Sequence, residues 1–291
     1  MRLSIIYRGP LSSCNYGCEY CPFAKHHETD EEHARDTQQL SRFVDWANTR
    51  KQHQLSVLFT PWGEALIRPR YQDAISTLTK SDTIEKVAIQ TNLSCRLEWV
   101  ENCDKSKLAL WATFHPTETT RQKFLAKCLE LVSRGVRFSV GAVGLKEHFD
   151  EILALRDELP DSVYFWINAY KRIESYYTDA DIELLTKIDP LFPMNNEYHP
   201  SLGKACRAGS SVISVDGDGQ IKRCHFISEK IGNIYDEEFE SALSESPCSN
   251  AVCGCHIGYV HMDELRLYDV FSGGILERVP ADWSPVSRLT V

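Results

Sequence analysis

The sequence predicts an α/β fold in which parallel strands alternate with the helices that cover them. Short apolar runs of strand length alternate with amphipathic helical patterns along the first two-thirds of the chain. Such alternation is typical of a parallel sheet with outer helices. The 291 residues suffice for one large domain with a small appendage. Length alone allows either a barrel or an open, doubly wound sheet.

Six apolar runs are expected to form the strands. In chain order they are Leu3–Tyr7, Leu55–Phe59, Val87–Gln90, Leu108–Phe114, Phe138–Val143 and Val163–Ile167. Each has the length of a buried strand in a sheet covered on both faces.

Four apolar stripes at helical spacing lie between these runs and predict helices. Gly135 and Pro160 follow the third and fourth stripes as stop signals. The stripes are Leu40, Phe43, Val44 and Ala47; Tyr71, Ala74, Ile75 and Leu78; Phe124, Leu125, Cys128, Leu129 and Val132; and Phe149, Ile152 and Leu153.

The pattern changes after about Asp189. An irregular segment is followed by a predicted β-hairpin that turns at the sequence Asp-Gly-Asp-Gly, with Cys206 before the hairpin and Cys224 on its second strand. We therefore expect a core domain over residues 1–189, a small domain over 190–260 and a tail over 261–291. The tail is expected to be weakly helical at first and to end in proline-containing residues along the surface.

Composition narrows the classes of function. Hydrophobic residues at 43% and charged residues at 25% are ordinary for a globular protein. A net charge of −9 without a basic stripe argues against a nucleic-acid partner. No stretch approaches the length of a membrane span, and the N-terminus lacks the features of a signal peptide. We expect a cytoplasmic protein without a membrane partner, whose eleven cysteines bind metal instead of forming disulfides.

Three cysteines follow the first predicted strand. Cys14, Cys18 and Cys21 form the pattern C-x3-C-x2-C. Three thiolates are one short of a closed four-ligand site, and a metal centre that does chemistry keeps one position open. Closely spaced cysteines also bind cubane iron–sulfur clusters. The alternatives are half of a zinc ribbon or buried packing residues, but the next cysteine is only Cys95.

With this motif the chain resembles the radical S-adenosylmethionine (radical SAM) enzymes. The resemblance implies a partial (β/α)6 barrel and a [4Fe–4S] cluster held by the three cysteines, with S-adenosylmethionine (SAM) on the free iron. It also implies reductive cleavage of SAM to a 5′-deoxyadenosyl radical, which takes a hydrogen atom from the substrate. Barrel chemistry gathers at the C-terminal ends of the strands, where this motif lies.

The same resemblance implies a set of cofactor contacts. Tyr20 stands where the family has an aromatic residue over the adenine. Gly63 and Glu64 match the centre of the family's Gly-Gly-Glu-Pro motif, whose outer residues are here Trp62 and Ala65. Glu64 is expected to accept hydrogen bonds from the amino group of SAM. The other implied contacts are Thr91, Asn92, Thr113, Gly141, Val143 and Asn168, all near strand ends.

His115 follows the fourth predicted strand and is the candidate catalytic residue. It is expected to face the barrel mouth, where it would bind cofactor or substrate or act in proton transfer. A histidine that only makes local hydrogen bonds is the open alternative.

A second cysteine group lies near the C-terminus. Cys206, Gly219 and Cys224 form C-x12-G-x4-C, which resembles the opening of the SPASM and twitch extensions of radical SAM maturases. That resemblance implies one auxiliary [4Fe–4S] cluster in a twitch-like extension. The favoured ligands are Cys206, Cys224, Cys253 and Cys255, with Cys248 as the alternative. A zinc site built from the same residues stays open.

The implied function is the maturation of a peptide or protein by oxidation or cross-linking, with an external electron donor such as flavodoxin or ferredoxin. The chain starts directly at the first strand, without an N-terminal peptide-recognition domain, so the substrate class stays open. The alternatives are a dehydrogenase or rearrangement reaction on a small polar metabolite and, more remotely, a non-catalytic zinc or iron–sulfur protein.

Overall fold

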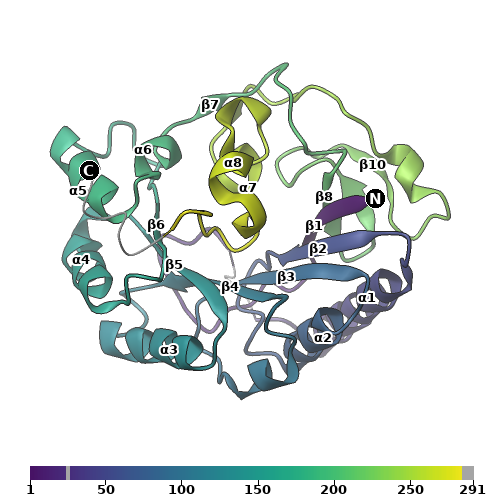
Figure 1. Cartoon of the computed structure of the whole chain (residues 1–291), viewed down its shortest axis with the longest axis horizontal. Helices are drawn as coiled ribbons and strands as arrows, with labels where there is room; N and C mark the ends of the chain where they lie inside the picture. The colour runs from purple at the N-terminus through teal and green to yellow at the C-terminus, as the bar shows by residue number, and fades with distance from the viewer. Residues whose placement is uncertain (24–26, 284–291) are drawn as a thin grey trace.

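A nine-stranded sheet forms the frame of the molecule. The computed structural model describes residues 1–23 and 27–283. Its central strands are β1 (Arg2–Arg8), β2 (Gln54–Phe59), β3 (Ile84–Thr91), β4 (Leu108–Phe114), β5 (Arg137–Val143) and β6 (Phe165–Asn168). They pair in parallel in sequence order and curve into a partial barrel (Figure 1). All six predicted strands are confirmed, although the sixth begins at Phe165 instead of Val163.

Helices cover the convex face of this sheet. They are α1 (Asp30–Thr49), α2 (Pro69–Thr79), α3 (Arg121–Ser133), α4 (Phe149–Glu158) and α5 (Asp179–Ile188), while a short 3-10 helix, η1 (Glu98–Asn102), connects β3 to β4. A capping box between Thr29 and Glu32 starts α1. The main core packs strand residues such as Ile5 and Val57 against helix residues such as Phe43.

The predicted apolar stripe of α3 is partly wrong. Phe124 and Cys128 are buried as expected, but Leu129 and Val132 are exposed by 45% and 42%. Leu131, which the prediction left out, is fully buried. Because each residue advances about 100° around a helix, the row through positions 124, 128 and 131 faces the sheet, and Leu125 packs beside it, partly buried.

The hairpin continues the same sheet beyond β1. β8 (Val212–Asp216) lies parallel to β1, and β9 (Gln220–Lys222) and β10 (Lys230–Asn233) follow in antiparallel order. The predicted hairpin is thus confirmed, but Cys224 lies two residues beyond β9 and not on the strand. The pairing of β8 with β9 ends at Ser214 and Lys222, and the chain then leaves the sheet. The division at residues 189 and 260 stays a prediction.

The remaining elements are short. They are η2 (Lys146–His148), α6 (Phe192–Asn195), β7 (His199–Pro200), η3 (Phe239–Ala242), β11 (Val252–Cys253), α7 (His256–Tyr259), η4 (Asp263–Leu265), α8 (Leu267–Phe271) and η5 (Ser272–Gly274). β7 and β11 pair with each other in a separate two-stranded sheet.

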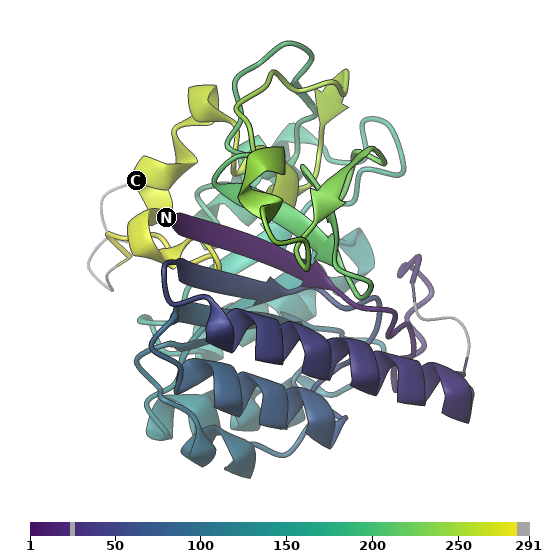
Figure 2. The ribbon, with the colours of Figure 1, turned by 90° about the vertical axis from the view of Figure 1, so that its right-hand side faces the viewer.

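The C-terminal segment 256–279 fills the concave face of the sheet. Figure 1 shows α7 and α8 inside the curve of the strands, and Figure 2 shows them across the sheet from α1 and α2. Ile257, Leu267 and Phe271 pack against Trp111 and Trp166 in a second core. The tail predicted from residue 261 onward therefore contributes buried core residues such as Leu267 and Phe271. Its last eight residues, on which the predicted proline-containing surface end partly falls, lie outside the described residues.

None of the helices in the described ranges is both long enough and apolar enough to cross a membrane.

Truncation of Phe271 tests how much the C-terminal segment contributes to stability. Phe271 is 1% exposed, so Phe271→Ala is expected to lower the free energy of unfolding by about 3–5 kcal/mol, measured by chemical denaturation. Val270 is 37% exposed, and Val270→Ala serves as the control, with an expected loss of about 0.5 kcal/mol or less. Equal losses in both variants would contradict this packing.

Candidate active site

The three motif cysteines line one cavity. Their loop begins where β1 ends, and the cavity it borders has a volume of about 270 Å³. None of the three thiols forms a disulfide, and the amide of Tyr16 lies 3.4 Å from Cys14 Sγ, to which it donates a hydrogen bond. The sequence-predicted residues that share this cavity wall are Gly63, Glu64, Thr91, Asn92, Thr113, His115, Val143, Asn168 and Cys255.

Backbone contact holds the loop after β2 against the cysteine loop. A Cβ atom on Gly63 would lie 1.8 Å from the carbonyl oxygen of Ser13, so no larger residue fits there without a shift of the backbone. The neighbouring amide of Glu64 donates to the same oxygen at 3.0 Å. Gly63 therefore sets the distance between the cysteines and the Glu64 carboxylate.

The Glu64 carboxylate is buried and held by three protein donors. Its Oε1 accepts from the Leu66 amide at 3.0 Å and from Thr91 Oγ1 at 2.9 Å, and its Oε2 accepts from the Asn92 amide at 2.5 Å. A carboxylate has about four acceptor positions, so one stays available for a ligand. Burial raises the pKa of Glu64 to about 7 although all three hydrogen bonds oppose the rise.

The Asn92 side chain ties β3 to the cysteine loop. Its Nδ2 donates to Asn15 Oδ1 at 3.1 Å and lies 3.8 Å from Cys14 Sγ. Asn92 and Thr91 thus hold Glu64 and the cysteine loop in one network.

His115 lies against Tyr20 and Cys18. Its Nδ1 is 2.7 Å from the Tyr20 hydroxyl and 3.4 Å from Cys18 Sγ, and the Tyr20 and His115 rings are nearly parallel. Burial lowers the pKa of His115 to about 4, so the ring is neutral at physiological pH. The side chain of His115 lines the cavity, as the catalytic hypothesis expects. It also makes local hydrogen bonds, as the alternative of a purely structural histidine expects.

Two predicted cofactor residues lie away from the lining of this cavity. Tyr20 directs its hydroxyl to His115. Gly141 lies under Trp166, because a Cβ there would come within 2.1 Å of the indole ring. For both residues, cofactor binding stays a prediction.

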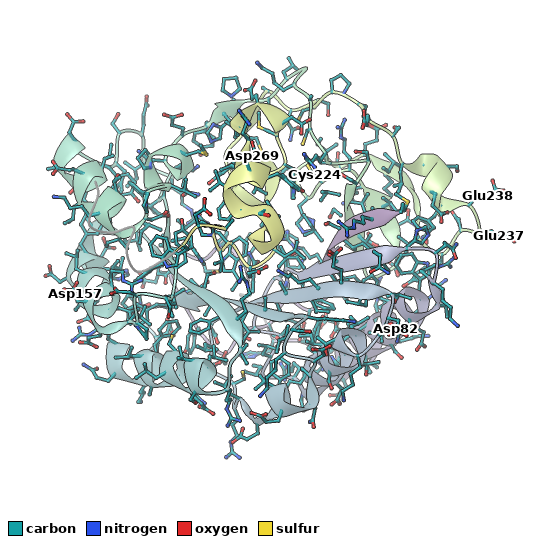
Figure 3. All side chains as sticks on the ribbon, in the orientation of Figure 1. Asp82, Asp157, Cys224, Glu237, Glu238 and Asp269 are labelled. Atoms are coloured by element: carbon teal, nitrogen blue, oxygen red, sulfur yellow. The ribbon has the colours of Figure 1, made fainter. Side chains whose placement is uncertain are left out.

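In the second cysteine group, Cys206, Cys224, Cys248 and Cys253 are half-buried and Cys255 is exposed. Burial raises the pKa of Cys206 and of Cys224, and the nearby Cys248 thiol adds to both rises. The pKa of Cys253 rises to about 12, first through burial and then through the neighbouring thiols, Cys255 included. Figure 3 shows Cys224 near the middle of the view, whereas Glu237 and Glu238 lie at its edge.

Cys255 also borders the cavity of the first cysteine motif. Burial raises the pKa of its thiol, while the positive charges of Lys171, Arg278 and Arg8 oppose that rise. The thiol has accessible surface although protein surrounds it, because that surface faces the cavity. Among the described residues, no group of three or more His, Cys, Asp or Glu side chains is arranged to hold a single metal ion.

The cavity also contains residues that the sequence did not place there. Trp111 and Trp166 line it from β4 and β6, and His256 and Arg278 line it from the C-terminal segment. A tryptophan in each of two strands was a visible signal, and His256 follows Cys255 directly, as a zinc ligand could, but no local pattern marked Arg278.

Comparisons with known proteins agree with this geometry. A sequence model described as the radical SAM superfamily matches residues 10–159. A histidine-tagged form of anSMEcpe with bound AdoMet is similar in structure, with a TM-score of 0.56 and 15% identity over 84% of this chain and 77% of that chain. No curated protein matches the sequence.

Streptococcus suis SuiB bound to S-adenosylmethionine also has a TM-score of 0.56, with 16% identity over 84% of this chain and 66% of that chain. Identities this low show a shared fold. The family match, which covers more than half of the chain, shows more: this protein belongs to the radical SAM superfamily, a family that implies a [4Fe–4S] cluster and SAM as cofactors.

Proposed function

We propose that this radical SAM enzyme matures a peptide or protein by oxidation or cross-linking at a carbon atom that carries no activating group. The observation that carries the proposal is one cavity bordered by three cysteine thiols, none of them in a disulfide, and by the Glu64 carboxylate. Three thiolates leave the fourth cluster position open for SAM.

The residues present suit these cofactors. Cys14, Cys18 and Cys21 would hold the cluster, and the free acceptor position of Glu64 would receive the amino group of SAM. When bound, the cluster and SAM supply the radical that removes a hydrogen atom from the substrate. Tyr20, Gly141 and the other predicted contacts at the strand ends would position the nucleoside part of SAM.

The chain itself orients the substrate and excludes water. Trp111, Trp166 and Ile257 wall the cavity inside the barrel, so a bound group would be shielded from bulk solvent. His115 is neutral and hydrogen-bonded, so it would orient Tyr20 and Cys18 or exchange a proton with the substrate, as the catalytic hypothesis requires.

An auxiliary [4Fe–4S] cluster is the second part of the proposal. Its ligands would be Cys206, Cys224, Cys248 and Cys253, within the proposed domain 190–260, because these four thiols interact pairwise. This set differs from the one favoured by sequence spacing, since Cys248 replaces Cys255. An external one-electron donor such as flavodoxin or ferredoxin belongs to the proposal because the reductive cleavage of SAM consumes one electron.

A peptide substrate is supported by similar folds. Native anSMEcpe is known with the Cp18Cys peptide and SuiB with its precursor peptide SuiA. The small volume of the cavity favours a second candidate, a small polar metabolite. None of the eleven cysteines, all of which lie in the described residues, forms a disulfide, and this supports a reducing, cytoplasmic location. The net charge of −9 supports a partner other than nucleic acid.

Replacement of Cys18 tests the catalytic cluster. In anaerobic protein reduced with dithionite, Cys18→Ala is expected to lower 5′-deoxyadenosine formation from SAM to background, because the cluster loses a ligand. Cys103, a buried thiol outside the cavity, provides the control Cys103→Ala, which should form the product at the wild-type rate. Unchanged product formation in Cys18→Ala would refute the assignment.

Replacement of Cys248 or Cys255 tests the auxiliary ligands. Cys248→Ala is expected to reduce iron from about eight to about four atoms per chain, whereas Cys255→Ala should keep about eight. Iron, sulfide and zinc analysis of reconstituted protein measures this. The reverse result would restore the ligand set expected from spacing, and stoichiometric zinc would support the zinc alternative.

Replacement of Gly63 tests the contact between the two loops. Gly63→Ala places a methyl group against the Ser13 carbonyl, so SAM affinity is expected to fall about tenfold or more through displacement of Glu64. Gly273 has open space around its Cβ position, and Gly273→Ala is the control. SAM titration by calorimetry measures both, and wild-type affinity in Gly63→Ala would show that the contact does not position Glu64.

A further inference from the structure

Arg278 is a buried cation with unpaired donors in the active-site cavity. It is the largest fully buried side chain, with 1% exposure, and it lines the cavity that the cysteine loop borders. Nothing in the described part of the chain accepts a hydrogen bond from its Nε or Nη1. Three of its five N–H bonds therefore lack an acceptor.

Asp189 does not satisfy this guanidinium. Its Oδ2 is 3.9 Å from Arg278 Nη2, which is beyond hydrogen-bond distance. The Asp189 carboxylate instead accepts hydrogen bonds from the Tyr164 hydroxyl at 2.5 Å and from the amides of Ile167 and Leu191. The carboxylate is thus engaged elsewhere and leaves most of the donor capacity of Arg278 free.

The backbone conformation of Arg278 is strained. Its φ is +53°, a region that side-chain-bearing residues rarely adopt. The preceding residue is fixed, since the Glu277 carboxylate pairs with Lys86 and Arg137 and its carbonyl accepts from Ser139. Strain and an under-bonded buried charge both oppose folding, and both are typical of a position kept for binding.

His256 offers a second free nitrogen in the same cavity. It is 4% exposed, and its Nε2 has no partner among the described residues. Its Nδ1 lies 3.4 Å from the Tyr259 hydroxyl, whose oxygen accepts from Asn195 Nδ2. The tautomer in which Nδ1 accepts from the Tyr259 hydroxyl carries the ring proton on Nε2. His256 is then a neutral donor beside the aromatic wall.

These donors lie below the cofactor residues. The guanidinium carbon of Arg278 is 4.6 Å from the Trp166 ring and 5.7 Å from the Trp111 ring. These tryptophans precede the ends of β6 and β4 by two and three residues, which corresponds to about 7–10 Å along a strand. The cysteine loop and Glu64 follow the strand ends, so Arg278 and His256 form the floor of the cavity.

We propose that Arg278 and His256 bind an anionic oxygen group of the substrate, a carboxylate or a phosphate. The floor presents N–H donors and a positive charge, which such a group satisfies through charge-assisted hydrogen bonds. In a peptide substrate the group is an acidic side chain or a C-terminal carboxylate, and in a metabolite it is a carboxylate or a phosphate ester. This inference rests on the proposed function, because it takes the cavity as the substrate site.

Binding of small anions tests the proposal without knowledge of the substrate. Cluster-loaded protein is titrated by calorimetry with sodium malonate and with sodium phosphate, at an ionic strength kept constant with chloride. We expect saturable binding to the wild type and a loss of about tenfold or more in Arg278→Gln, with Arg278→Lys between the two. The anion that binds more tightly identifies the carboxylate or the phosphate as the group recognised.

Arg266→Gln is the matched control. Arg266 lies in the same C-terminal segment, also has a positive φ of +50°, and has a side chain that is 80% exposed. This variant removes the same charge and is expected to bind both anions as the wild type does. An equal loss in Arg266→Gln and Arg278→Gln would attribute binding to net charge and overturn the proposal.

His256→Phe keeps the test valid if the Arg278 variants do not fold. Phenylalanine preserves the ring contacts with Trp111 and Phe271 but removes the Nε2 donor, so anion affinity is expected to fall severalfold. Circular dichroism and thermal unfolding establish whether each variant is native. Wild-type affinity in His256→Phe and in any folded Arg278 variant, or no anion binding to the wild type, would overturn the proposal.

A SAM titration separates the substrate from the cofactor. Arg278→Gln is expected to bind SAM within about twofold of the wild type, because its side chain lies below the strand ends. A loss of SAM affinity as large as the loss of malonate affinity would assign Arg278 to the cofactor carboxylate and refute the proposal. Anion binding without 5′-deoxyadenosine formation would instead refute the proposed function and leave the anion site standing.

Discussion

The burial of the concave face of an unclosed sheet is the constraint on which the rest of this structure depends. Six parallel strands curve but do not close, and their inner face is apolar at Leu58, Ala88 and Ala109. The C-terminal segment covers that face, and each fully buried large side chain in it, such as Leu267, contributes about 1.5–3 kcal/mol. The same segment supplies the inner wall of the cavity. The C-terminal segment therefore determines both the stability of the fold and the shape of the candidate site.

The mouth of the cavity is built differently, by backbone contacts between loops. The cysteine loop, the turn after β2 and the end of β3 are joined through the Ser13 carbonyl, the absence of a side chain at Gly63 and the hydrogen bonds of Glu64. Backbone contacts of this kind are short and rigid, so they fix thiols and carboxylate relative to one another before a ligand arrives. The cavity therefore has an aromatic wall, formed by Trp111 and Trp166, and a polar rim around Glu64.

One residue of the second cysteine group reaches the cavity of the first motif. Cys253 lies near the other thiols of its group, and Cys255, two residues later, borders the cavity that the first motif lines. The segment between β11 and α7 thus links the two cysteine groups. The cations Lys171, Arg278 and Arg8 oppose the rise that burial causes in the pKa of Cys255.

The sequence by itself determined the six central strands, the place of the cysteine motif after β1 and the place of Gly63 and Glu64 after β2. Local periodicity and short motif spacing predict these features, and both depend only on residues that are near one another in the sequence. Only the tertiary structure decided that Leu131 faces the core in place of Leu129 and Val132, that Cys255 borders the first cavity, and that Arg278 and His256 form its floor. The physical reason is that a local pattern shows which residues an element offers for burial. It does not show which distant segment will cover them, and here residues 256–279 return to strands that lie about a hundred or more positions earlier in the chain.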